Sequence, residues 1–146
     1  MKKIIIFDFN RTIYDPDDNC LIPGARFVLR TLLRRGFSLY LVSRAGQSRK
    51  DLIEKLAIKK YFSRIIVAEE KSKKDFERIV TPKMINRRAS FVVGDRVRKE
   101  IRISNSLGLQ TIWFRAGKFA DEKPRKKIEQ PTYIVRTLPD VLLLVH

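Results

Sequence analysis

Acidic and hydroxyl side chains stand directly after three apolar segments of this 146-residue sequence. Asp8 follows the first segment, Ser43 follows the second, and the pair Gly94-Asp95 follows a later one, with Glu100 close behind. Each segment has the length and the continuous apolar character of a buried strand in a parallel sheet. Because the carboxyl ends of parallel strands share one edge, we expect these side chains to form a single site there.

This set of residue types favours phosphoryl chemistry. Two carboxylates suit Mg²⁺, a hard cation that keeps several waters and shares the oxygens of a substrate phosphate. A carboxylate can also be the nucleophile that forms an aspartyl-phosphate. Ser43 and nearby backbone N–H groups can hold phosphate oxygens, and a lysine can neutralise the transferred group. Lys71, Lys73 and Lys74 follow the third apolar segment, so at least one of them is expected to reach the site.

Predicted strands and helices alternate along the chain. Strands are expected at residues 3–9, 37–42, 65–68, 90–93 and 111–114, with a last edge strand at 133–135. Helices are expected at residues 23–35, 73–80, 96–107 and 137–145. A further helix is expected to follow a capping box formed by Ser48 and Asp51. Thr137 and Asp140 are expected to be the cap pair of the last helix. Polar loops are expected at residues 15–20 and 115–130.

This alternation predicts an α/β fold in which helices cover both faces of a central sheet. We expect a doubly wound, three-layer sandwich of the Rossmann-like type, with a mostly parallel sheet of about five strands. The sequence shows no internal repeat, linker or low-complexity tract. Residues 1–146 are therefore expected to form one domain.

The same residues resemble the motifs of the haloacid dehalogenase-like (HAD) hydrolase superfamily. Its usual first motif is D-x-D-G-T after an apolar strand, where this chain has DFNRT at residues 8–12. Its usual last motif is G-D with another acid four or five residues on, which Gly94, Asp95 and Glu100 match. The stretch NSLGLQTIWFRAGKFA also looks like the family's segment after that motif, so the resemblance covers nearly the whole chain.

The resemblance implies roles for the acidic positions. Asp8 would be the nucleophile and a Mg²⁺ ligand. The backbone carbonyl of Asn10 would be a second ligand. Asp95 would be a third ligand, supported by Gly94 and Glu100.

The resemblance also implies which groups meet the substrate. Thr12 and Ser43 would lie beside the transferred phosphate, and Arg44 and Arg11 are further candidates for substrate binding. A lysine of the family also belongs in the site. Lys71 is the preferred choice because of its spacing to the following phenylalanine, and the two lysines after Ser72 remain alternatives.

Two positions depart from the family pattern. Asn10 stands where phosphatases of the family carry a second aspartate, which protonates the leaving oxygen and later activates water. An amide can do neither, and the loss of such a group typically costs ~10²–10⁴-fold in rate. Arg11 stands where the motif usually has glycine, so it adds bulk and charge at the entrance. The resemblance therefore implies a Mg²⁺-dependent phosphohydrolase that acts through an aspartyl-phosphate on Asp8 and is slowed by Asn10.

Two other functions stay open at this point. The first is a catalytically weak binding protein with the HAD fold, which Asn10 and the net charge of +16 favour. Its partner would be anionic, and nucleic acid is one candidate. The second is a HAD-like hydrolase of a bond other than a phosphate ester, acting through Asp8, because the dehalogenases of the family also lack the second aspartate.

The length and charge of the chain suggest what could reach the site. Family members often insert a cap domain, but residues 14–22 form a short segment and no insertion follows Ser43, so we expect an open site with no large cap. An open site suits a large or polymeric phosphorylated substrate, or a second subunit of a homo-oligomer. Phe119 and Trp113 could stack on bases, although Trp113 is more typical of a core residue at a strand end.

The rest of the composition predicts a cytoplasmic protein. Cys20 is the only cysteine, so no internal disulfide can form. His146 is the only histidine, so histidine catalysis is not expected. The apolar run before Asp8 is too short for a signal peptide, and no apolar run approaches the ~18 residues that a membrane span needs. No membrane partner is therefore expected.

Overall fold

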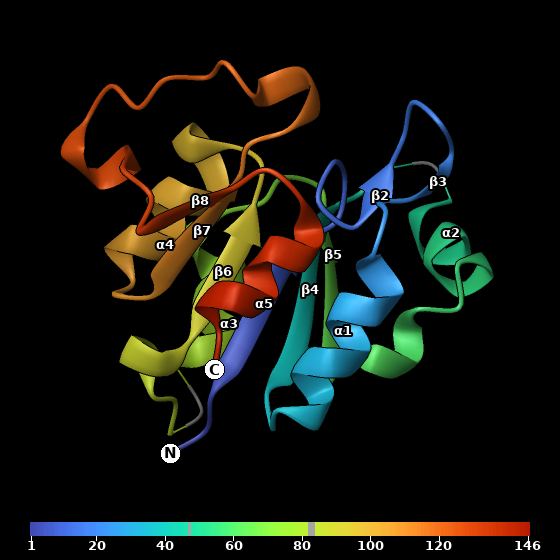
Figure 1. Ribbon diagram of the computed structural model, residues 1–146, viewed down its shortest axis with the longest axis horizontal. Coiled ribbons are helices and arrows are strands. Elements are labelled where there is room, and N and C mark those ends of the chain that lie inside the picture. Colours follow the sequence, from blue (N-terminus) through green and yellow to red (C-terminus); the bar gives the residue numbers. More distant parts are fainter. Residues whose placement is uncertain (47, 82–83) are drawn as a thin grey trace.

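The computed structural model describes residues 1–46, 48–81 and 84–146, which contain a six-stranded sheet (Figure 1). The strand order is β5-β4-β1-β6-β7-β8, and every neighbouring pair is parallel. The strands are β1 (Ile4–Asp8), β4 (Ser38–Arg44), β5 (Arg64–Ala68), β6 (Phe91–Gly94), β7 (Gln110–Phe114) and β8 (Tyr133–Val135). The predicted fold class is confirmed. The sheet has six strands rather than about five because β8 pairs along β7 in full register.

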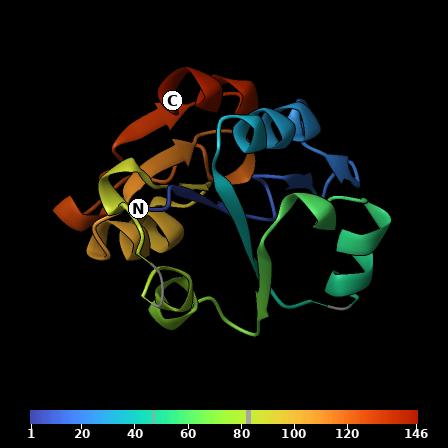
Figure 2. The same cartoon turned by 90° about the horizontal axis from the view of Figure 1, so that it is seen from below.

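Helices cover both faces of the sheet (Figure 2). On one face α1 (Ala25–Arg34) packs against α5 (Val141–Leu144), and on the other α3 (Lys73–Val80) packs against α4 (Arg102–Ser106). The remaining helix, α2 (Arg49–Lys55), lies at the β5 end of the sheet. The three-layer arrangement follows from the right-handed crossovers that parallel strands require.

The central strand β1 is buried on both of its faces. Ile5 and Phe7 enter the core that contains α1, whereas Ile4 and Ile6 enter the core that contains α3. All four side chains are fully buried, and burial of one such side chain stabilises a fold by about 1.5–3 kcal/mol. Asp8 is the last residue of this strand, so the best-packed element of the sheet holds it in place.

The predicted capping box at Ser48 and Asp51 is wrong. Ser48 has a left-handed backbone (φ 57°), and its side chain caps no described backbone N–H group. The same S-x-x-D pattern forms a capping box at the start of α3, where the Ser72 backbone N–H donates to the Asp75 carboxylate at 2.9 Å. Ser72 is extended, as an N-cap residue must be. This box fixes the helix start immediately after Lys71.

Two of the predicted helices begin irregularly. The segment predicted as one helix from residue 96 opens with a π-helix, Val97–Ile101, before α4. Such wide turns are frequent at functional sites, and this one carries Glu100. The C-terminal segment opens with a 3₁₀ turn, Leu138–Asp140, before α5, and the Thr137 side chain caps none of the described N–H groups, so the predicted cap pair is wrong.

Two connections lie above the carboxyl edge of the sheet, at the top of Figure 1. The loop predicted at residues 15–20 is a small antiparallel hairpin of β2 (Tyr14–Asp15) and β3 (Cys20–Leu21). The long loop of residues 115–130 is present as predicted, with short 3₁₀ turns. Across the described ranges, no large cap domain covers this edge, and no helix is long and apolar enough to cross a membrane.

Candidate active site

The strand ends bring the predicted residues together at a cavity of about 310 Å³. Asp8 ends β1, which lies between β4 and β6, so it stands between Ser43 on one side and Gly94-Asp95 on the other. The cavity is lined by all the predicted site residues except Thr12 and Gly94. The lining also includes five residues that the sequence analysis did not assign to the site: Glu70, Arg96, Lys99, Lys118 and Phe119.

Lys71 joins two of the acids. Its ammonium group donates hydrogen bonds to Asp8 Oδ1 and to Glu100 Oε1. Burial alone would lower the pKa of Lys71, but the two carboxylates outweigh that effect and raise it. The lysine is therefore a fixed positive charge in the floor of the cavity. The other two candidates, Lys73 and Lys74, are exposed on α3.

Three carboxylates lie close together in the floor of this cavity. One oxygen each of Asp8, Asp95 and Glu100 lies within 4.8 Å of the others, and all three residues are buried. Burial raises the pKa of Asp95 and of Glu100, and the negative charge of Asp8 raises both further. When all three carboxylates are ionised, they exceed the one ammonium by two negative charges, which a divalent cation would balance. Glu100 Oε2 is buried with no hydrogen-bond partner among the described residues, which also fits a site built for a cation.

Two neighbours hold the last acidic motif in shape. A Cβ atom at Gly94 would lie 2.9 Å from the Glu100 Cβ, so only glycine lets the π-helix pass this close to β6. The indole N–H of Trp113 donates to the Asp95 carbonyl at 3.0 Å. Trp113 is 2% exposed. It is a core residue, as its position at a strand end predicts, and is not available to stack on bases.

Two hydroxyl groups lie near Asp8: Ser43 stands on β4, on the opposite side of β1 from the last acidic motif, and Thr12 stands in the turn after β1. Thr12 Oγ1 is 3.5 Å from Asp8 Oδ2, a long contact, and the threonine is fully buried. Ser43 Oγ donates to the Arg44 carbonyl at 3.0 Å. To bind a phosphate oxygen, the Ser43 hydroxyl would have to turn its hydrogen from that carbonyl toward the cavity.

Arg49 holds Asn10, and the sequence analysis missed this pair. The Arg49 Nη1 group donates to Asn10 Oδ1 at 3.2 Å, and its guanidinium lies 4.8 Å from the centre of the Phe9 ring. An arginine can only donate hydrogen bonds, so the Asn10 oxygen faces it and the amide NH₂ is left for the cavity. No local pattern in the sequence marks this pair, because the two residues lie 39 positions apart.

The turn after β1 gives residue 11 a backbone conformation that favours glycine. Arg11 has a left-handed backbone (φ 61°), a conformation that costs a residue with a side chain about 1–2 kcal/mol. The turn is closed by the Phe9 carbonyl, which accepts from the N–H groups of Ile13 and Tyr14 at 2.9 and 3.0 Å. The Arg11 guanidinium leans outward to Asp17 at 3.0 Å.

A second unpredicted pair ties the long loop to the site. Arg96, next to Asp95, forms an ion pair with Glu122 at 2.8 Å and lies 4.1 Å from the centre of the Phe119 ring. The Arg98 backbone N–H donates to the other Glu122 oxygen at 3.2 Å. The loop of residues 115–130 is thereby fastened beside the acids, and it contributes Lys118 and Phe119 to the cavity wall.

The fold and this arrangement of acids, lysine and hydroxyls define the class of protein. Residues 70–141 match the family model described as HAD-hydrolase-like, and solved HAD-superfamily structures share the fold of the chain. Over these residues, and in its fold, the chain is similar to the haloacid dehalogenase-like hydrolases, as its motifs predict.

Particular relatives can then be compared. The glyceraldehyde 3-phosphate phosphatase of Pyrococcus furiosus is 24% identical over 127 residues, which are 83% of this chain and 52% of the relative. The chain thus spans about half the length of the curated relatives that it matches.

Two solved structures illustrate the shared fold. YfnB from Bacillus subtilis, assigned as a HAD-hydrolase and solved bound to magnesium, superposes with a TM-score of 0.79 at 15% identity over 99% of both chains. The core domain of a Streptococcus pneumoniae protein assigned as a phosphoglycolate phosphatase gives 0.70 at 18% identity, over 99% of this chain and 95% of that one. At these identities the likeness establishes the fold alone.

Proposed function

We propose that this protein is a Mg²⁺-dependent phosphohydrolase that forms an aspartyl-phosphate on Asp8. One observation carries the proposal: Asp8 is buried at the end of β1, with the Lys71 ammonium on one oxygen and two further carboxylates within 4.8 Å. The curated relatives named as phosphatases support the same class of reaction.

The reaction has two halves. An Asp8 oxygen attacks the phosphorus of a phosphate monoester, the new O–P bond forms as the ester P–O bond breaks, and the leaving oxygen keeps the electron pair. Lys71 holds Oδ1, so Oδ2, on the side of Thr12, is the attacking atom. Water then attacks the acyl phosphate, which releases phosphate and restores the carboxylate. Ser43 and Arg44 would hold the phosphate oxygens during both halves.

Asp8, Asp95 and the backbone carbonyl of Asn10 would hold Mg²⁺, with Glu100 in support. The ion would supply positive charge beside the transferred phosphoryl group. The closeness of three carboxylates to a single ammonium, and the unpartnered Glu100 oxygen, support a divalent cation there. The residues present therefore fit the metal.

Asn10 restricts the chemistry. Its oxygen is occupied by Arg49, so it can offer only N–H hydrogen bonds to the substrate. It can stabilise a departing oxygen, but it can neither protonate that oxygen nor activate water. We therefore expect slow turnover, with the best rates for esters whose leaving groups need no proton.

The test is hydrolysis of p-nitrophenyl phosphate by the wild type, with and without Mg²⁺. We expect Mg²⁺-dependent turnover that Asp8→Asn abolishes, because the amide is not a nucleophile. Asp18→Asn, the same change at an exposed aspartate, is the matched control and should keep wild-type activity. Equal activity of Asp8→Asn and the wild type would overturn the proposal.

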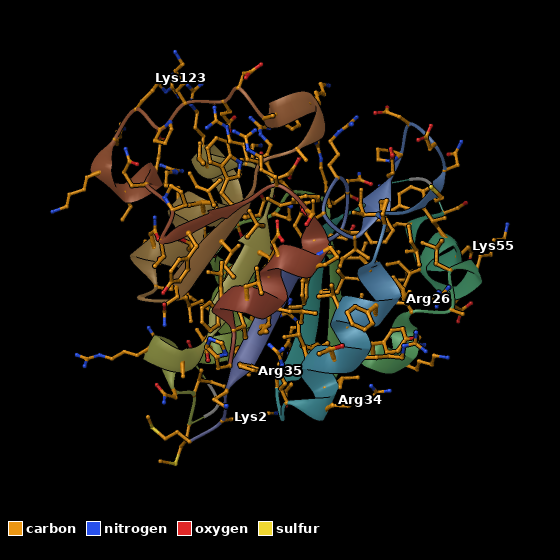
Figure 3. All side chains as sticks on the ribbon, in the orientation of Figure 1. Lys2, Arg26, Arg34, Arg35, Lys55 and Lys123 are labelled. Carbon is orange, nitrogen blue, oxygen red and sulfur yellow. The ribbon has the colours of Figure 1, made fainter. Side chains whose placement is uncertain are left out.

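A second candidate is a weakly catalytic protein that binds an anionic partner. The net charge of +16 and the missing acid at Asn10 favour it. Of the basic side chains labelled in Figure 3, Lys123 lies above the carboxyl edge of the sheet and Lys2 lies near the opposite edge. Tight binding of an RNA oligomer that weakens steeply with salt, together with no turnover, would favour this candidate.

A cytoplasmic location belongs to the same proposal. The only cysteine, Cys20, is an exposed free thiol. Free thiols are typical of compartments kept reduced. Homo-oligomer formation remains a prediction, which the molar mass in solution would test.

A further inference from the structure

A second cavity, of about 320 Å³, lies directly beside the active-site cavity. Arg11 lines both, so its side chain forms the boundary between them. The second cavity lies under the β2–β3 hairpin, where the end of β7 meets the chain that follows β8. Its apolar wall is formed by five side chains: Ile22, Pro23, Phe114, Ala116 and Leu138.

The charged groups of this second cavity balance one another. Arg11 and Arg136 contribute two positive charges, and Asp15 and Asp17 contribute two negative charges. Arg11 and Asp17 form an ion pair at 3.0 Å. A further anionic group would therefore gain little here, whereas an uncharged ring would bury its faces against the apolar wall.

The chemistry of the neighbouring active site independently restricts the leaving group of the phosphate ester. Asn10 has no proton to give, so the leaving oxygen must depart as an anion. An aryloxide is a far better anion than an alkoxide, because phenols such as the tyrosine side chain have a pKa near 10 whereas water has one of about 15.7. The amide NH₂ of Asn10 can then donate a hydrogen bond to the departing oxygen.

From these two observations we infer that the substrate is an aryl phosphate monoester, with its phosphate at Asp8 and its ring in the cavity beyond Arg11. This inference rests on the proposed phosphohydrolase function. In the first half-reaction the Asp8–phosphorus bond forms, the phosphorus–aryloxide bond breaks, and the aryloxide later takes its proton from water. Arg11, at the boundary, can place its guanidinium against the ring face.

The experiment compares phenyl phosphate with acetyl phosphate. Acetyl phosphate also has a leaving group that needs no acid, but it has no ring, so it reports on the Asp8 chemistry alone. We expect the wild type to have a higher kcat/KM for phenyl phosphate than for glycerol phosphate, whose alkoxide is the poorer leaving group. A preference for glycerol phosphate over phenyl phosphate would overturn the inference.

Ala116→Leu tests the cavity itself, because it adds a bulky group to the apolar wall. We expect the ratio of kcat/KM for phenyl phosphate over acetyl phosphate to fall by about tenfold, the selectivity that a few buried methylene groups can provide. Ala120→Leu makes the same change on the same loop, outside the described lining of both cavities, and should leave the ratio unchanged. An unchanged ratio in Ala116→Leu would overturn the inference.

Ile22→Ala tests the same cavity in the opposite direction. Removing this side chain enlarges the cavity, so 1-naphthyl phosphate should gain relative to phenyl phosphate. If the larger ring gains nothing, the ring does not lie there. Activity on acetyl phosphate that Asp8→Asn abolishes, without any of these ring effects, would remove the inference but keep the proposed function. No Asp8-dependent turnover of any ester would remove both.

Discussion

The floor and the entrance of the active-site cavity differ in the kind of chemical groups that they contain. The floor consists of four strongly interacting ionisable groups: Asp8, Lys71, Asp95 and Glu100. The entrance contains a neutral amide, Asn10, held by a half-buried arginine. The floor retains the groups that a metal and a nucleophile require, whereas the entrance lacks the group that moves protons. If the proposed function holds, the difference means that this chain can form an aspartyl-phosphate without the group that normally transfers the proton.

The largest expected effect comes from removing the positive charge from the floor of the cavity. Lys71→Met removes the only cation that contacts Asp8 and Glu100 in the described chain. We expect turnover of p-nitrophenyl phosphate to fall by about 10²–10³-fold, the usual cost of losing one preorganised electrostatic group. Lys74→Met, on the exposed face of α3, should keep wild-type rates. A small effect at Lys71 would mean that the floor does not stabilise the reacting groups.

The next largest effect is expected from adding a proton donor at the entrance of the cavity. Asn10→Asp adds a carboxyl group where a proton donor would stand, so hydrolysis of alkyl phosphates should rise by about 10²-fold. Aryl phosphates, which need little acid help, should gain much less. Steady-state kinetics on both ester classes measure this contrast. Equal gains for both would show that Asn10 limits the reaction by some means other than proton transfer.

A third effect concerns the stability of the fold, which the acids of the floor make dependent on pH and on bound metal. In the metal-free protein, burial and the Asp8 charge raise the pKa of Asp95 to about 9 and that of Glu100 to about 7. The folded protein therefore binds protons that the unfolded chain has lost. Its stability should fall as pH rises from about 4 toward 9.

Mg²⁺ must displace these protons, so it should stabilise the fold more at pH 8 than at pH 6. At saturating Mg²⁺ the melting temperature should rise by several degrees at pH 8, consistent with about 2–3 kcal/mol of binding energy. Thermal melts with and without Mg²⁺ at the two pH values measure this. Glu100→Gln should reduce the pH dependence. A Mg²⁺ effect that is larger at pH 6 would contradict the raised pKa values.

The smallest effect concerns the backbone of the entrance. Arg11→Gly removes the cost of a left-handed side-chain residue, about 1 kcal/mol. The greater freedom of glycine in the unfolded chain offsets part of this gain, so we expect a net stabilisation of about 0.5 kcal/mol. Urea unfolding measures it. A clear loss of stability would mean that the exposed ion pair with Asp17 outweighs the strain.

Much of the floor could be predicted from the sequence, and much of the entrance could not. The carboxyl ends of parallel strands share one edge, so the types of the residues that follow the apolar segments were enough to bring Asp8, Ser43 and Asp95 together. The pairs Arg49–Asn10 and Arg96–Glu122 join residues 39 and 26 positions apart. No local pattern encodes such pairs, because they depend on how separate segments approach one another.

The capping boxes show the same limit on a smaller scale. Ser48 and Ser72 both begin an S-x-x-D pattern, and local propensity cannot separate them. Only the second has the extended backbone that lets the box close. The position of Lys71 depended on this, because the helix start after Ser72 turns Lys73 and Lys74 outward and leaves Lys71 facing the acids.

Trp113 gives the protein an internal optical probe. It is the only tryptophan in the chain, and its indole N–H donates to the backbone carbonyl of Asp95. Indole emission responds to nearby charge and to hydrogen bonding. A cation beside Asp95, or a phosphoryl group on Asp8, would change the electric field at the ring. Fluorescence of the unlabelled protein would therefore report each step at the active site as it happens.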